Sequence, residues 1–154
     1  MSTTRTKKTD PKSAAALDSP APLANPEAEL SAAQLRELQQ LLIDERKRLR
    51  EGLKRHVGEA TETRDGLSDE GDQASHAADQ AYLLRFADKE YKLLREVEAA
   101  IGRMQTGEYG ICEGNGEPIG YKRLRLRPWT RYSVSYKEEV ERDRAERRKS
   151  TAGN

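Results

Sequence analysis

The sequence predicts a mainly α-helical protein, an antiparallel coiled-coil hairpin followed by a small module and a C-terminal helix. Three observations predict this fold class. Two long segments carry apolar residues in steps of three and four among charged residues, which is typical of helices that pack along a narrow stripe. A short polar stretch separates the two segments. Beyond residue 106 the periodicity gives way to glycine, proline and aromatic residues.

The first helix is expected to begin at Ser31. Ser31 and Gln34 form a capping box, and Leu30 and Leu35 stand at the positions of a hydrophobic staple. The preceding residues 1–29 are rich in Ser, Thr, Ala, Lys and Pro, so we expect a disordered tail that buries nothing. The predicted apolar stripe of the helix is Leu35, Leu38, Leu42, Leu49, Leu53 and Val57.

A second helix is expected over about residues 72–105, and it completes a hairpin over residues 30–106. The polar turn at about residues 61–72 would form the tip of this hairpin. Because the chain offers no further apolar helices to cover these two, a coiled coil is favoured over a larger bundle. The predicted stripe of the second helix is Ala74, Ala77, Ala81, Leu84, Ala87, Tyr91, Leu94, Val97, Ile101 and Met104.

Residues 107–149 are expected to form a zinc-finger-like module and the C-terminal helix. Tyr109–Cys112 and Ile119–Tyr121 are strand-like pieces on either side of a Gly-Asn-Gly sequence at residues 114–116, which is a hairpin turn signal. The charged segment over about residues 135–149 is expected to be helical and to close the chain.

Four positions of this module have the spacing of a four-cysteine zinc site, but only one holds a cysteine. Cys112, Asn115, Ser133 and Tyr136 fit a C-x2-C-x17-C-x2-C frame. Structural zinc needs four ligands, usually Cys or His, and both histidines of the chain lie far upstream. We therefore expect no metal at these vestigial positions. Aromatic packing against the base of the hairpin is expected to replace it, from Tyr109, Tyr121, Trp129, Tyr132 and Tyr136.

The single cysteine, Cys112, has three interpretations. It can be an apolar residue packed inside the module, since free cysteine is often buried. It can be a redox sensor, although the chain holds no second cysteine to resolve it. It can also contribute to an intermolecular metal site. No nucleophile and base stand at a catalytic spacing, so we do not expect an enzyme.

Composition limits the partners of this protein. The chain has 154 residues, 34% apolar and 36% charged, with 28 basic and 27 acidic side chains, which argues against binding to nucleic acid by net charge alone. The charge is sorted, however: residues 61–80 hold six acids against one base, and residues 118–137 hold six bases and no acid. This sorting suggests two contact surfaces. No apolar run is long enough for a signal peptide or membrane span, so a soluble cytoplasmic protein is expected.

Several separated motifs resemble the DksA/TraR family of bacterial regulators that bind RNA polymerase. They are Asp69-x-x-Asp72-x-Ala74, Gly107-Glu108-Tyr109-Gly110-Ile111-Cys112-Glu113, Glu117-Pro118-Ile119-Gly120 and Arg123-Leu124-x-x-Arg127-Pro128. The resemblance covers about residues 30–145. It implies that the coiled coil enters the secondary channel of RNA polymerase, brings an acidic tip close to the catalytic centre, and alters the stability of open complexes without reading promoter sequence.

The resemblance also implies two sets of site residues. Asp69, Asp72 and Ala74 match the tip that approaches the polymerase active site, although acids there would also cap the helix and favour its dipole. The positions that present groups to guanosine tetraphosphate (ppGpp) are held by Lys89, Leu93, Arg127 and Lys137. Glu96 departs from the family pattern, because it stands where a lysine is usual and would repel phosphate.

Two other functions are left open by the residues. The basic segment Lys122–Arg131, with aromatic side chains available for stacking, could bind nucleic acid, although no base-reading helix accompanies it. The hairpin could also be a structural coiled coil with no regulatory role.

Overall fold

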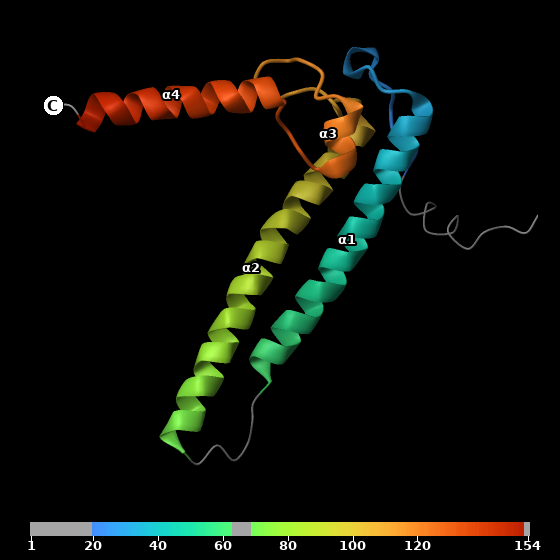
Figure 1. The fold of residues 1–154 in the computed structure, drawn as a ribbon. Helices are drawn as coiled ribbons and strands as arrows, with labels where there is room; N and C mark the ends of the chain where they lie inside the picture. Colours follow the sequence, from blue (N-terminus) through green and yellow to red (C-terminus); the bar gives the residue numbers. More distant parts are fainter. Residues whose placement is uncertain (1–19, 63–68, 153–154) are drawn as a thin grey trace, which may run out of the picture.

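The computed structural model describes residues 20–62 and 69–152. In chain order the helices are the short 3-10 helix η2 (Pro26–Ala28), α1 (Ala32–Thr61), α2 (Glu70–Thr106), α3 (Tyr121–Leu126) and α4 (Val134–Ala152). α1 and α2 lie side by side and run in opposite directions (Figure 1). The module with α3 sits at one end of this pair, and α4 extends away from it (Figure 1). The mainly helical fold and the antiparallel hairpin are confirmed.

The start of α1 is set by the predicted capping box. The Ser31 hydroxyl accepts a hydrogen bond from the backbone N–H of Gln34 at 3.2 Å, and the Gln34 side chain accepts one from the N–H of Ser31 at 2.9 Å. Two of the N–H groups that a helix start leaves unpaired are thereby satisfied. At the same end of the hairpin, α2 stops at Gly107, whose left-handed φ of 78° suits glycine.

The core lies in the half of the hairpin next to the module. Buried side chains from α1 meet buried side chains from α2, and four residues of the module complete the same cluster. Its members are Leu35, Leu38, Leu42 and Leu49 of α1, Leu94, Val97, Ala100, Ile101 and Met104 of α2, and Tyr109, Cys112, Ile119 and Leu124 of the module.

The predicted stripe is wrong in the half of the hairpin toward the tip. Val57, Leu84 and Tyr91 are exposed, by 40%, 51% and 50%, and Ala74, Ala77 and Ala81 are exposed as well. A two-helix coiled coil repeats every 3.5 residues, so the seam of α2 continues from Met104 in alternating steps of three and four. It therefore reaches Glu90, Ala87 and the half-buried Leu83 instead of Tyr91 and Leu84. The facing positions of α1 are Gly52, His56 and Ala60.

Residues 20–29 correct the predicted tail. The N–H of Leu23 donates to the carbonyl oxygen of Met104 at 2.8 Å, and Ala28 is buried. Gly110 makes room for this segment, because a Cβ there would lie 2.8 Å from the Cβ of Ala28. Segment 20–29 thus packs on the junction of α2 and the module, while residues 1–19, also predicted to belong to the tail, lie outside the described residues.

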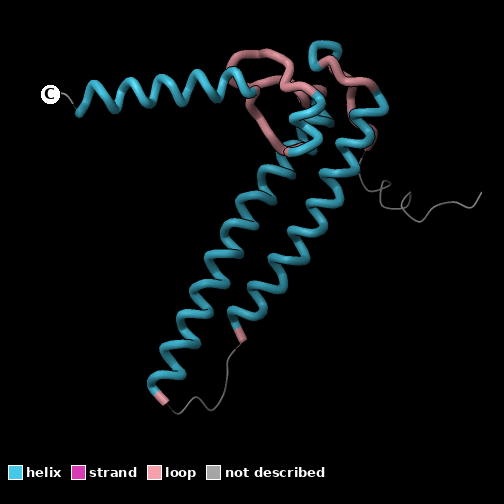
Figure 2. The backbone as a smooth tube through the Cα atoms, viewed as in Figure 1, coloured by secondary structure: helices cyan, strands magenta, loops and turns pink. Residues whose placement is uncertain are grey.

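The module contains the predicted hairpin turn but not the predicted strands. Its backbone pairing is a single antiparallel bridge between Ile111 and Pro118, and no strand forms in the described residues (Figure 2). The N–H of Cys112 donates to the carbonyl oxygen of Glu117 at 2.8 Å, and the N–H of Ile119 to that of Gly110 at 2.8 Å. The pairing ends there because the helix α3 begins at Tyr121, which the sequence pattern did not indicate.

α4 is longer than predicted, and its backbone stays apart from those of α1, α2 and α3. Its residues from 141 to 151 are all exposed. This part of the helix is charged and has no apolar face. None of the helices in the described part of the chain is long and apolar enough to cross a bilayer.

Candidate functional site

The predicted tip residues lie at the first turn of α2. Asp69 is the N-cap residue, yet its side chain makes no capping hydrogen bond, and Asp72 lies within the first turn. Asp69, Asp72 and Ala74 are all exposed. Among the described residues neither carboxylate has a hydrogen-bond or ion-pair partner, so the capping interpretation is reduced to an interaction with the helix dipole. Residues 63–68, which belong to the predicted tip, lie outside the described residues.

Further acids surround the tip. A cavity of about 360 Å³ between the last turn of α1 and the first turns of α2 is lined by Glu59, Glu62 and Asp79, together with His76, Gln80, Tyr82 and Leu83. The described acids of the region 61–80 therefore lie together at the tip end of the hairpin.

The predicted nucleotide positions are only partly brought together. Arg127 and Lys137 line one cavity of about 250 Å³, between α2 and the module, and Glu96 lines the same cavity. Lys89 instead lines a separate hollow with Leu84, Arg85, Asp88 and Lys92, and Leu93 is half-buried against the core. The cavity of Arg127, Lys137 and Glu96, which we call the basic pocket, thus holds two of the four predicted residues and the departing glutamate.

Four residues that line the basic pocket were not predicted as nucleotide-site residues: Trp129, Thr130, Arg131 and Tyr132. The Arg131 guanidinium and the Lys137 ammonium each lie 5.8 Å from the centre of the Tyr132 ring, a cation–π distance. The signal available in the sequence was the alternation of bases and aromatic residues from residue 127 to residue 137. It was interpreted as core packing or as a nucleic-acid surface, and not as a nucleotide pocket.

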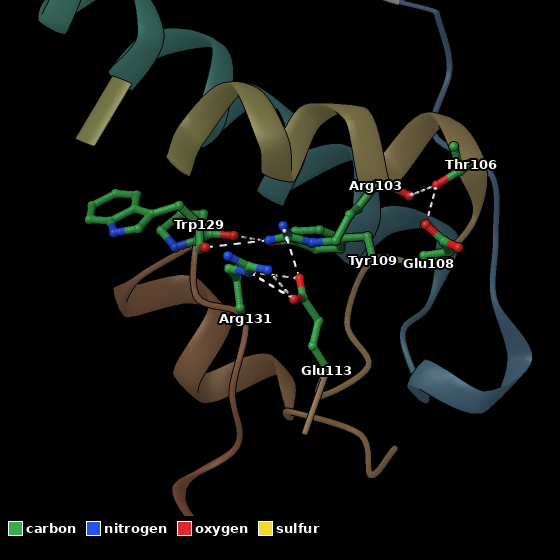
Figure 3. Close-up of polar contacts among 8 residues, drawn as sticks. Arg103, Thr106, Glu108, Tyr109, Glu113, Trp129 and Arg131 are labelled. Atoms are coloured by element: carbon green, nitrogen blue, oxygen red, sulfur yellow. Dashed lines mark hydrogen bonds and ion pairs between the residues drawn. The ribbon is translucent and has the colours of Figure 1, made fainter. Parts of the chain in front are cut away.

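The carboxylate of Glu113 binds Arg131, one of the residues that line the basic pocket (Figure 3). Glu113 accepts hydrogen bonds from Arg131 Nε at 2.8 Å and from its Nη2, and it lies 3.4 Å from Arg103 Nη1. Hydrogen bonding by Arg131 holds the pKa of Glu113 below its ordinary value. Arg103 also donates to the carbonyl oxygen of Trp129 at 3.4 Å, and its burial lowers its pKa. Oppositely charged residues this far apart in sequence leave no pattern from which the network could be predicted.

The four vestigial zinc positions do come together, but with a different chemistry. Cys112 and Ser133 are buried. The Ser133 hydroxyl accepts from the N–H of Tyr136 at 3.3 Å and lies 3.0 Å from the hydroxyl of Ser135, which donates to Glu117 at 2.9 Å. Asn115 donates to the same carboxylate of Glu117 at 2.8 Å.

This donor set does not fit zinc. A structural zinc ion needs four thiolate or imidazole ligands, whereas these positions offer one thiol, an amide, a hydroxyl and a phenol ring. In the described ranges, 20–62 and 69–152, no three His, Cys, Asp or Glu side chains are arranged to hold a metal ion. Burial opposes ionisation of the Cys112 thiol, but hydrogen bonds from Ser133, Asn115 and Gly114 outweigh it, so its pKa lies below the ordinary value.

Tyr109 is the largest fully buried side chain of the described chain. Its hydroxyl donates to the carbonyl oxygen of Pro128 at 2.7 Å, and burial raises its pKa. Tyr121, Trp129, Tyr132 and Tyr136 are partly buried against the same core. All five aromatic residues therefore pack as predicted, but Tyr109 is the central one and Trp129 is only half-buried.

Family models match most of this chain. Residues 34–104 match the model described as DnaK suppressor protein DksA, N-terminal domain. Residues 107–147 match the model described as prokaryotic dksA/traR C4-type zinc finger.

Individual relatives agree with the family models. An RNA polymerase-binding transcription factor DksA of Caulobacter vibrioides is 40% identical over 87 residues, which are 56% of this chain and 59% of that protein. General stress protein 16O of Bacillus subtilis is 36% identical over 74% of this chain and 72% of its own length.

The fold has a counterpart among solved structures as well. The structure of transcription factor DksA2 from Pseudomonas aeruginosa superposes with a TM-score of 0.67 and 34% identity, and the match covers 73% of this chain and 87% of that chain. The same family is indicated by the two adjoining family matches, by the hairpin fold and by the motifs at the tip and in the module. The chain therefore belongs to the DksA/TraR family.

Proposed function

We propose that this protein binds RNA polymerase, inserts its hairpin into the secondary channel of the enzyme, and modulates initiation through the acidic tip. Relatives named as RNA polymerase-binding transcription factors support the choice of partner. The family match alone does not explain how the hairpin engages the enzyme. The observation that carries the proposal is the distribution of apolar side chains along the hairpin.

The half of the hairpin toward the tip exposes several large apolar side chains. Its seam holds Gly52, His56, Ala60, Ala87 and Glu90, which are small or polar, and one large apolar residue, the half-buried Leu83. Large apolar side chains nearby are exposed instead: Val57, Tyr82, Leu84, Phe86 and Tyr91. A solvated coiled coil has the opposite arrangement, and exposed apolar patches mark contact with a partner. This half of the hairpin is therefore suited to contact another macromolecule.

The exposed residues of α2 lie on both sides of the seam. Leu84 and Tyr91 each follow a seam residue in the sequence, whereas Tyr82 and Phe86 each precede one. Since successive residues of a helix are turned by about 100°, the two pairs flank the seam on opposite sides. Tyr82 and Phe86 also contact each other, with ring centres 6.5 Å apart. Apolar contacts on two sides suit a partner that encloses the hairpin, as a channel does, better than a flat surface.

The tip and the basic pocket would then have separate roles. Asp69 and Asp72 are exposed and without side-chain partners among the described residues, so their charge is available to act on another molecule. In the basic pocket, Arg127 and Lys137 suit the phosphates of ppGpp, since charge-assisted hydrogen bonds to phosphate oxygens are strong. Glu96 in the same pocket would weaken such binding.

Nucleic-acid binding by the segment Lys122–Arg131 has less support. Arg123 donates to the carbonyl oxygen of Tyr132 at 3.0 Å, and Arg131 is paired with Glu113. Arg125 lies 3.5 Å from Glu37. Three of the bases in this segment are thus engaged within the chain and are not free to neutralise phosphates.

The proposal is tested with Asp72→Asn in transcription from a ribosomal RNA promoter. Asparagine keeps the size of the side chain and removes its charge. We expect normal folding, polymerase binding within about twofold of wild type, and loss of the effect on transcription, because exposed single-site changes alter stability little. Asp143→Asn on α4, which removes the same charge far from the tip, is the matched control and should remain active. A wild-type protein that fails to bind polymerase, or an Asp69→Asn, Asp72→Asn variant that regulates normally, contradicts the proposal.

A further inference from the structure

A histidine and a glutamate face each other across the seam halfway along the hairpin. His56 Nδ1 of α1 lies 2.7 Å from Glu90 Oε2 of α2, and the two side chains are only 15% and 12% exposed. Since a carboxylate can only accept, the imidazole donates this hydrogen bond. Nearer the module, the buried seam residues are leucine, valine, isoleucine and methionine. A polar pair has replaced apolar packing at this level of the hairpin.

The surroundings of the pair are shaped to hold it. Glu90 lies against the backbone of α1 at Gly52, where an added Cβ would be 2.7 Å from Glu90 Oε1. The Phe86 ring meets the His56 ring edge to face, with centres 4.9 Å apart and an interplanar angle of 76°. Gly52, His56, Phe86 and Glu90 therefore form one site that fits together in a single alignment of the two helices.

The rest of this half of the hairpin gives the helices little to align by. Its other seam residues are Ala60 and Ala87, whose small side chains interlock weakly across the seam, and the half-buried Leu83. Apolar residues keep most of their contacts when one helix slides or turns, whereas a buried hydrogen-bonded pair loses its partner. A polar residue at a seam position is the best-attested way in which coiled coils fix register, at some expense of stability.

We propose that the His56–Glu90 pair, seated by Gly52, sets the register of α1 against α2 and so places the tip relative to the module. His56 and Glu90 are positioning residues: they act through Asp69 and Asp72 and are not themselves expected to touch the partner. The register itself does not depend on the function proposed above, but its consequence for transcription rests on that function.

The register is tested by replacing the pair with an apolar one, His56→Leu with Glu90→Leu, in a Cys112→Ser background. Spin labels at Glu59→Cys and Asp79→Cys, which line the same cavity near the tip, report the distance between α1 and α2 by double electron–electron resonance. Labels at Arg50→Cys and Glu98→Cys, whose side chains are hydrogen-bonded at 2.6 Å, report the level nearer the module. We expect the apolar variant to melt at the same or a higher temperature, with an unchanged distribution at 50–98 and a broadened or shifted one at 59–79.

Two further variants separate register from general stability. Glu90→Gln keeps an oxygen that can accept a hydrogen bond from His56, so this variant should keep the narrow distribution of the wild type at 59–79. Gly52→Ala displaces the Glu90 carboxylate while favouring helix formation, so it should broaden the distribution without lowering the melting temperature. A distribution at 59–79 that is equally narrow in the wild type, the apolar variant and Gly52→Ala overturns the proposal.

Transcription provides the functional readout. At equal occupancy of polymerase, the effect of the apolar variant on transcription should be more than about tenfold smaller than that of the wild type. A displacement of about 1 Å at a reacting centre is enough for a loss of that order. If the effect on transcription changes among the variants with their melting temperatures, and not with their distance distributions at 59–79, the positioning role is overturned. If the wild-type protein has no effect on transcription, the proposed function fails, yet the distance measurements still decide the register.

Discussion

The ring of Tyr136 lies directly on the backbone of Gly114, so closely that a methyl group added at Gly114 would overlap the ring. Position 136 is the last of the four positions with zinc-site spacing, and Tyr132 stacks on the same ring with centres 5.3 Å apart. The side chain that replaces the fourth ligand therefore closes the loop 112–116 by packing. It joins the start of α4 to this loop, as a metal would join the two ligand pairs.

Gly114→Ala should destabilise the module by about 1–3 kcal/mol, because overpacking a closely packed contact forces side chains or backbone to shift. The free energy of unfolding is measured by denaturant titration, followed through the fluorescence of Trp129, the single tryptophan of the chain. Gly102→Ala is the matched control, since nothing lies within 4 Å of an added Cβ there. It should be neutral or stabilising by up to about 1 kcal/mol. Equal effects of the two substitutions would contradict the packing role of Tyr136.

Removal of metal should leave the protein folded. We expect the free energy that zinc binding lends to the folding of small domains to be supplied here by the aromatic residues packed on the core and by the Glu113–Arg131 pair. We expect less than one zinc ion per ten chains by elemental analysis, an estimate that follows from a single thiol among the four positions. The melting temperature in excess chelator should equal that without it. One zinc per chain, with unfolding on chelation, would show that these four positions do form a structural zinc site.

Tyr109→Phe should lower the free energy of unfolding by about 1–3 kcal/mol at neutral pH, because it leaves the Pro128 carbonyl oxygen buried without its donor. The gap to the wild type should narrow at alkaline pH. Burial raises the pKa of Tyr109 in the folded state, so its contribution is complete below the ordinary tyrosine pKa of about 10 and is lost as pH rises above that value. Denaturant titrations at pH 8 and at about pH 10.5 measure both effects. A gap that widens with pH contradicts this sign.

Glu96→Lys should strengthen binding of ppGpp to the protein–polymerase complex. The substitution replaces a carboxylate with an ammonium group in the pocket of Arg127 and Lys137, and a gain of about tenfold corresponds to about 1.4 kcal/mol. Glu146→Lys on the exposed part of α4 makes the same change in net charge away from the pocket. Equilibrium binding of labelled nucleotide distinguishes the two. An equal gain from both variants would mean that net charge, and not the pocket, governs nucleotide affinity.

Patterns that depend on neighbours in the chain could be read from the sequence. The capping box of Ser31 and Gln34 fixed the start of α1, because its hydrogen bonds join residues three apart. The leucine stripe near the module, the Gly107 stop and the turn at 114–116 are local in the same way. The four zinc-site positions also came together as their spacing predicted, since the turn and the start of α4 bring them to one loop.

Features that depend on which atoms meet across the fold needed the tertiary structure. Hydrophobicity placed Leu84 and Tyr91 in the seam, but the 3.5-residue repeat set by packing of α1 on α2 placed Glu90 there, against Gly52 and His56. The basic pocket and the Arg103–Glu113–Arg131 network join residues with no local pattern. Segment 20–29, rich in proline and alanine, was predicted to be a tail, and it packs on the junction of α2 and the module, where Gly110 leaves room for Ala28. The sequence alone thus predicted the two hairpin helices, the C-terminal helix and the cap of α1, but not α3 or the packing of the module. Contact between distant elements decided which side chains are buried, because burial is a property of the pair and not of either residue alone.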